Sequence, residues 1–236
     1  MDKRFTFEEL LAIVATLRSD QGCPWDKAQT HESIKPTTLE EAYEVNQAVT
    51  DLTATGNPDN LIEELGDLLL QILFHCRIAE ENAEFTLEDV IDGIATKMIR
   101  RHPHVFGQKT YDSVEEQQAD WETIKSKEHH NENISAKEEL EKIPAAFPAL
   151  IRSQKAARKA MKRDIISSGD EDIFKNMLES VVGLQMAAAN PGDQDHFSKK
   201  LGEALFSITW LAAKYMIPAE IALNDVTDRF IRDLDH

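Results

Sequence analysis

The sequence predicts an all-α protein, and three observations carry this prediction. Apolar residues recur at spacings of three and four along most of the chain, which is the period of a helix with one buried face. Alternating strand-like runs are absent, and the 236 residues include only nine glycines for hairpin turns. Residues that start and stop helices stand where the periodic segments begin and end.

Residues typical of helix ends lie beside several of the periodic segments. Asn57-Pro58 opens the third helix, Thr86 is the candidate N-cap of the fourth, and Pro103 follows the end of that helix. The helices predicted from the apolar spacing span 6–18, 38–54, 59–81, 86–101, 114–127, 145–162, 171–188, 195–216 and 218–234.

Composition excludes several classes of protein. Apolar residues make up 42% of the chain, which is enough for a core, and the net charge of −17 argues against a nucleic-acid duplex or an anionic membrane as partner. The N-terminus is acidic where a signal peptide would be apolar, and no segment has the length of apolar residues that a membrane helix needs. Cys23 and Cys76 form no metal or disulfide pattern, so we expect a cytoplasmic protein with small buried thiols.

The chain is predicted to consist of an N-terminal domain at 1–125, a polar linker at 126–144 and a C-terminal repeat at 145–236. The linker is highly charged, and prolines follow it. Segment 61–69 resembles segment 198–206, each with a glycine inside a helix, and two weaker matches occur in the same order in both halves. This order is what a duplication leaves.

Two pairs of acidic residues are the strongest candidate site. Glu41 and Glu44 are three residues apart, and so are Glu64 and Asp67, which places each pair on one helix face. In an acidic protein such pairs are often solvated surface. On a helical wheel, however, the second pair lies in a polar strip about 80° wide between apolar walls, which points into a bundle. This strip contains Asn60, Glu64, Asp67, Gln71 and His75.

Four converging carboxylates need compensation, because desolvation and mutual repulsion both oppose their ionised forms. Either their pKa values rise or cations fill the space between them. Hard oxygen ligands without a nearby thiolate favour Mg²⁺, with Mn²⁺ as the alternative ion. Carboxylate-held Mg²⁺ usually takes its remaining ligands from water and substrate phosphates.

The motifs around these acids resemble those of MazG-type nucleoside triphosphate pyrophosphohydrolases, and the resemblance covers most of the chain. Glu-Glu-x-x-Glu at 40–44 and Glu-x-x-Asp at 64–67 carry it. They are joined by Gly-Cys-Pro-Trp-Asp-Lys at 22–27, Gln-Thr-His at 29–31, Arg-Arg-His-Pro-His-Val-Phe at 100–106, Trp-Glu-x-Ile-Lys at 121–125 and Pro-Ala-Leu at 148–150.

The resemblance implies an all-α homodimer whose helices form four-helix bundles. It also implies Mg²⁺-dependent conversion of nucleoside triphosphates to monophosphates and pyrophosphate, with a broad substrate range serving nucleotide-pool control. By position, it assigns the metal ligands to Glu41, Glu44, Glu64 and Asp67. One carboxylate would orient or deprotonate the attacking water, and Glu40 and Glu41 both remain candidates for that role.

Basic and aromatic residues are candidate substrate contacts. Lys97, Arg100 and Arg101 either stabilise a helix C-terminus or bind phosphate, and the resemblance favours phosphate. Trp25 either plugs the end of the bundle or stacks on a base without selecting it. The pair His102 and His104 is expected to have a structural or phosphate-adjacent role rather than to bind a metal.

The second repeat departs from the family pattern. Ser180 and Gly183 stand where the second and third glutamates of the first motif would be, and Lys200 and Glu203 stand in place of Glu-x-x-Asp. We therefore expect the C-terminal repeat to be structural. This erosion also supports a rival hypothesis, a helical dimer or scaffold that senses nucleotides with weak or no catalysis. A third hypothesis keeps the enzyme and restricts it to one pyrimidine or modified nucleotide.

Overall fold

The structure is a computed structural model, and it describes residues 4–128, 134–189 and 192–234. All the secondary-structure elements assigned within these ranges are helices, which confirms the all-α prediction. The chain divides into two compact units, Met1–His129 and His130–His236. No helix among the described residues is both long and apolar enough to cross a bilayer.

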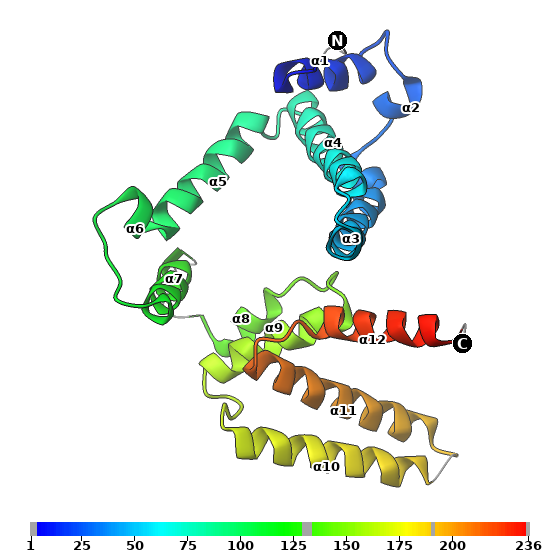
Figure 1. Ribbon diagram of the computed structural model, residues 1–236, viewed down its shortest axis with the longest axis vertical. Helices are drawn as coiled ribbons and strands as arrows, with labels where there is room; N and C mark the ends of the chain where they lie inside the picture. Colours follow the sequence, from blue (N-terminus) through cyan, green and yellow to red (C-terminus); the bar gives the residue numbers. More distant parts are fainter. Residues whose placement is uncertain (1–3, 129–133, 190–191, 235–236) are drawn as a thin grey trace. The chain divides into compact units, whose positions relative to one another are not determined.

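The helices of both units are labelled in Figure 1. The first unit contains α1 (Phe7–Leu17), α2 (Pro24–Lys27), α3 (His31–Thr55), α4 (Asp59–Glu81), α5 (Leu87–Arg101), α6 (Pro103–Phe106) and α7 (Val114–Glu128). The second unit contains α8 (Ala136–Glu141), α9 (Ala149–Lys162), α10 (Asp170–Ala188), α11 (Gln194–Lys214) and α12 (Ala219–Asp233).

The first unit is organised around a hairpin of α3 and α4, which lie side by side (Figure 1). Gly56 ends α3 in the left-handed conformation, with φ of 74°, and thereby turns the chain toward α4. Ile34 of α3 packs against Phe74 and Ile78 of α4. This apolar contact holds the two helices together at the end of the hairpin that lies away from the turn.

Helix α3 begins seven residues before its predicted start at residue 38. Thr30 and Ser33 form a capping box, in which each side chain bonds the other residue's backbone N–H, at 2.9 and 3.2 Å. Pro36 removes one helical hydrogen bond inside the helix. The cap and the burial of Ile34 offset that loss, so the helix continues through the proline.

Helix α1 covers one side of α4. Val14 packs with Leu73, Cys76 and Leu87 in a buried cluster. At the end of α1, the buried Arg18 forms an ion pair with Glu81 of α4 at 2.8 Å. The Arg18 guanidinium also donates to two backbone carbonyls in 26–29, at 2.6 and 3.1 Å, and so ties the segment around α2 to the hairpin.

The second unit contains a similar pair of packed helices, α10 and α11, with α9 against α11. Ala157, Ile173, Trp210 and Ala213 form its buried cluster. The Trp210 indole N–H donates to the carbonyl of Ser167 at 3.0 Å, so the tryptophan is satisfied within the core.

Part of the segment predicted as a polar linker, 126–144, is helical. Helix α7 extends to Glu128, and α8 occupies Ala136–Glu141 behind a capping box of Ser135 and Glu138. Residues 129–133 lie outside the described residues. The predicted domain boundaries stay a prediction.

Candidate metal centre

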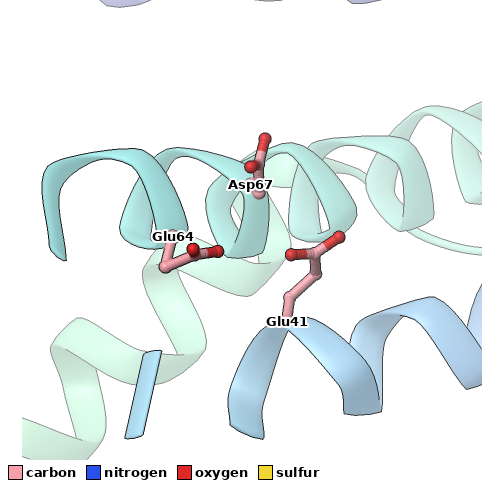
Figure 2. A group of neighbouring side chains, drawn as sticks. All are labelled: Glu41, Glu64 and Asp67. Atoms are coloured by element: carbon pink, nitrogen blue, oxygen red, sulfur yellow. The ribbon is translucent and has the colours of Figure 1, made fainter. Parts of the chain in front are cut away.

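The two predicted acidic pairs lie on the two helices of the first hairpin. Glu41 comes from α3, and Glu64 and Asp67 come from successive turns of α4. One carboxylate oxygen of each lies within 4.8 Å of the others. Figure 2 shows the Glu41 side chain reaching from α3 toward α4, with the Glu64 carboxylate turned toward it. Three half-buried oxygen donors on two helices are a suitable set of ligands for a divalent cation.

The carboxylates of this group repel one another, as predicted, and this repulsion shifts their pKa values. Burial raises the pKa of Glu41, and the negative charges of Asp67, Glu44 and Glu64 raise it further. The pKa of Glu64 is also raised, first by desolvation and then by the charge of Glu44. Positive charge placed among these carboxylates would relieve this strain, as a bound cation does.

Glu44 lies one turn after Glu41 on α3, and its side chain is exposed. The described group of mutually close donors consists of Glu41, Glu64 and Asp67, with Glu44 at its edge, where its charge acts on both Glu41 and Glu64. Glu40 is exposed on α3 beside Glu41. The roles assigned to these two glutamates stay predictions.

The polar strip of α4 continues beyond the acids to His75, as the helical wheel places it. The Nδ1 atoms of His75 and His31 lie 2.8 Å apart, and Nε2 of His75 lies 3.2 Å from the Thr38 hydroxyl. Burial, followed by the charge of His31, lowers the pKa of His75. His31 belongs to the part of α3 that the apolar spacing did not predict as helix.

Comparison with known proteins identifies the family of this hairpin. Residues 29–106, which span α3, α4 and α5, match the MazG nucleotide pyrophosphohydrolase domain. The chain is 37% identical over 225 residues to the nucleoside triphosphate pyrophosphohydrolase/pyrophosphatase MazG of Thermotoga maritima, an alignment covering 95% of this chain and 82% of that protein. The chain belongs to the MazG family.

Two further relatives extend this result. The nucleoside triphosphate pyrophosphohydrolase of Escherichia coli K12 is 35% identical over 230 residues, which cover 95% of this chain and 84% of that protein. The uncharacterized protein YabN of Bacillus subtilis is 36% identical over 226 residues, which cover 96% of this chain and 45% of that protein. The relatives that are named for an activity are hydrolases of phosphoric anhydride bonds, and this MazG chain belongs to that family of enzymes.

The predicted basic cluster of the MazG chain lies on the last turns of α5, at Lys97, Arg100 and Arg101. The Arg101 guanidinium carbon lies 5.3 Å from the centre of the Trp121 ring on α7, and the Lys125 ammonium lies 5.0 Å from the same ring. Trp121 and Lys125 were part of the resemblance but were not counted among the predicted site residues. Their i, i+4 spacing places both residues on one face of α7, which the sequence could have indicated, whereas the contact with Arg101 of α5 is not contained in that spacing.

Trp25 lies on α2 and is 72% exposed, so it does not plug the end of a bundle within this chain. The Trp25 carbonyl accepts a hydrogen bond from the Gln29 side chain at 3.1 Å, which holds the short helix. The exposed indole is free to stack on a planar group.

The two histidines after α5 have structural partners. His102 bonds the carbonyl of Met98 through Nδ1 at 2.7 Å, at the end of α5. The side-chain nitrogen of Gln117 lies 3.1 Å from Nε2 of His104. Both interactions fit the predicted structural role. Cys76 is buried, and burial raises the pKa of its thiol, which makes it unreactive.

Proposed function

We propose that this MazG chain hydrolyses nucleoside triphosphates to monophosphates and pyrophosphate, with Mg²⁺ held by Glu41, Glu44, Glu64 and Asp67. The observation that carries this proposal is the convergence of three carboxylates from two helices, all within 4.8 Å. Oxygen donors in a half-buried, mutually repelling group fit Mg²⁺, or Mn²⁺ in its place. When bound, such a metal neutralises the triphosphate charge and lowers the pKa of a coordinated water.

The chain's own residues supply the base. A water molecule loses its proton to a carboxylate and attacks the α-phosphorus, and pyrophosphate leaves. Glu41 is one candidate for this base. As a metal ligand it would lose its raised pKa, because a bound cation offsets the charges of the neighbouring acids, so it could act as the base only where the other acids hold the metal. Glu40, exposed at the preceding position of α3, is the alternative base.

Substrate binding is proposed to use the basic and aromatic residues of the first unit. Lys97, Arg100 and Arg101 would bind phosphate oxygens, since arginine offers a planar fork of donors and lysine offers a compact charge. The exposed indole of Trp25 would stack on the base. Because every base has a π-face, stacking discriminates weakly, and we expect a broad range of nucleotides.

The chain is proposed to act as a homodimer. Two helices cannot enclose a core on both of their faces, and the α3–α4 hairpin carries large apolar residues that are 42–66% exposed. A second hairpin packed against such residues would complete a four-helix bundle. The residues concerned are Leu39, Tyr43, Val49, Ile62, Leu65 and Ile72. Light scattering should give twice the chain mass of 26.7 kDa, and a monomeric mass would contradict the dimer.

The function is tested by incubating the purified chain with each nucleoside triphosphate and Mg²⁺, then measuring pyrophosphate and monophosphate. We expect product with several bases, and none after chelation of the metal. Glu64→Gln removes one donor and should abolish turnover, whereas Glu203→Gln in the second unit should not change it. Nucleotide binding without product would favour the nucleotide-sensing scaffold instead.

A further inference from the structure

The end of the α3–α4 hairpin away from its turn carries a short chain of polar contacts. The rings of His31 and His75 are nearly parallel, with centroids 5.1 Å apart and planes 10° apart. Their Nδ1 atoms are 2.8 Å apart. At one side, Nε2 of His31 lies 3.1 Å from the Glu84 carboxylate, and at the other, Nε2 of His75 lies 3.2 Å from the Thr38 hydroxyl.

The geometry restricts the protons of this pair. Only one of two nitrogens 2.8 Å apart can carry the hydrogen between them, so one Nδ1 donates and the other accepts. At least one of the two imidazoles is therefore neutral. The carboxylate of Glu84 can only accept when ionised, so Nε2 of His31 donates to it. The two rings thus form a directed hydrogen bond rather than a pair of repelling cations.

These contacts are the polar link between the two helices that carry the acids. Among the described residues, every hydrogen bond that joins a side chain of α3 to a side chain of α4 passes through His75. The neighbouring acids act in the opposite sense, because Glu41 and Asp67 repel each other across the same pair of helices. At the open end of the hairpin, the apolar contact of Ile34 with Phe74 and Ile78 supplies attraction, and the directional hydrogen bonds of His75 favour one register.

We propose that His31, His75 and Thr38 form a polar latch that fixes the register of α3 on α4 and so positions the carboxylates of the metal centre. Thr38 lies three residues, one helical turn, before Glu41. His75 lies eight residues after Asp67, about 12 Å along α4. All three are positioning residues, and none is proposed to touch the substrate. The contacts of the latch do not depend on the proposed function, whereas their effect on metal affinity rests on that function.

The test uses two variants and one matched control in the full chain. Thr38→Val removes the hydroxyl that faces His75 and keeps the side-chain shape. His75→Phe keeps an aromatic ring at this position and removes both hydrogen bonds of His75. Thr53→Val is the control. Within the described part of the chain, the Thr53 hydroxyl bonds its own helix alone, at the Val49 carbonyl at 2.9 Å, and Thr38 makes the same kind of bond to the Ile34 carbonyl at 3.0 Å.

The first readout is amide hydrogen exchange in the absence of metal. We expect both latch variants to speed exchange in residues 34–41 of α3, whereas the control leaves these rates unchanged. Equal exchange in the wild type and both latch variants would overturn the latch, whatever the metal does.

The second readout is Mn²⁺ affinity by calorimetry. We expect about a tenfold loss in the latch variants, similar to the loss of a hydrogen bond that supports a metal ligand, and no loss in the control. Faster exchange with unchanged Mn²⁺ affinity would overturn the positioning role. A wild-type chain that takes up no Mn²⁺ would refute the proposed function and the positioning role together, while the exchange result would still decide whether the latch exists.

Discussion

The two helical hairpins of this chain are built alike, but they carry different charged side chains at corresponding positions. In both, two long helices pack together and the second carries a glycine, Gly66 in α4 and Gly202 in α11. The first hairpin gathers three carboxylates. At the position that the sequence aligns with Glu64, the second hairpin has Lys200, whose ammonium bonds Glu203 at 2.8 Å.

The facing helix is adapted to this lysine. A Cβ at Gly183 would lie 3.5 Å from the Cδ of Lys200, so the lysine stem lies over the glycine. The pKa values differ accordingly: that of Glu64 is raised by desolvation and by other carboxylates, whereas that of Glu203 is lowered by its hydrogen bond to Lys200. We infer that the ammonium of Lys200 supplies in the second hairpin the positive charge that a bound metal ion would supply in the first.

The largest expected effect comes from making the first hairpin resemble the second. Glu64→Lys should abolish pyrophosphate release, a loss of about two orders of magnitude or more, which is typical when one catalytic electrostatic group is removed. The ammonium can pair with Asp67 as Lys200 pairs with Glu203, so folding should persist. Pyrophosphate assays and circular dichroism check both points. Retained turnover would place the reaction elsewhere.

The reverse change is expected to create a binding site. Gly183→Glu together with Lys200→Glu adds two carboxylates beside Glu203, and replacing a helical glycine also removes a cost of about 1 kcal/mol. We expect calorimetry to show additional Mn²⁺ bound per chain compared with the wild type, without additional turnover. Lys200→Ala, which removes the ammonium and adds no ligand, is the matched control. If the double variant binds no more Mn²⁺ than this control, the comparison of the two hairpins fails.

A third prediction concerns pH and stability. Because the folded-state pKa values of Glu41 and Glu64 lie above the usual value for a glutamate, the folded chain binds more protons than the unfolded chain between the usual and the raised pKa. The unfolding free energy contributed by these groups therefore falls as pH rises through this window. Binding of Mg²⁺ offsets this loss and adds about 2.7 kcal/mol at a hundredfold excess over its dissociation constant.

The measurement for this prediction is the melting temperature with and without Mg²⁺. We expect a larger increase at neutral pH than at about pH 5, where protons compete for the same carboxylates. Glu41→Gln should melt slightly higher than the wild type without metal and should lose most of the Mg²⁺ response. An equal Mg²⁺ response in the wild type and this variant would argue against Glu41 as a ligand.

Local patterns in the sequence predicted much of the fold. The apolar period gave the bounds of α4, 59–81, and those of α5 to within one residue. The helical wheel of α4 placed Asp67 and His75 on one strip, and the structure gives both of them polar partners in α3. These features depend on residues within one helix, where spacing along the chain determines which side chains share a face.

Contacts between distant segments could not be predicted in this way. The apolar spacing predicted a helix that begins at residue 38, so His31, the partner of His75, lay outside it, whereas α3 begins at His31. The lysine stem over Gly183 depends on the packing of α10 against α11, which no single-helix pattern contains. Helix α8, within the segment predicted as a linker, is a single short run that begins with a capping box and has no apolar period.

The smallest predicted effect tests whether α4 and α11, the second helices of the two hairpins, have the same C-terminal cap. After α4, Ala83 has φ of 56°, and the next N–H, of Glu84, bonds the Ala79 carbonyl at 2.9 Å. After α11, Met216 has φ of 55°, and the Ile217 N–H bonds the Ala212 carbonyl at 2.9 Å. Both are Schellman caps with a non-glycine residue in the left-handed conformation, which costs about 1 kcal/mol or more for a residue with a Cβ.

Ala83→Gly and Met216→Gly should therefore each stabilise the chain, by about 0.5–1 kcal/mol after the extra freedom of glycine in the unfolded chain is counted. Paired urea melts of each variant and the wild type measure this gain. Ala119→Gly is the control: Ala119 is exposed within α7, and glycine there should destabilise by about 1 kcal/mol. A gain at one cap and a loss at the other would show that the two hairpins end differently in solution, despite their matching backbone angles and hydrogen bonds.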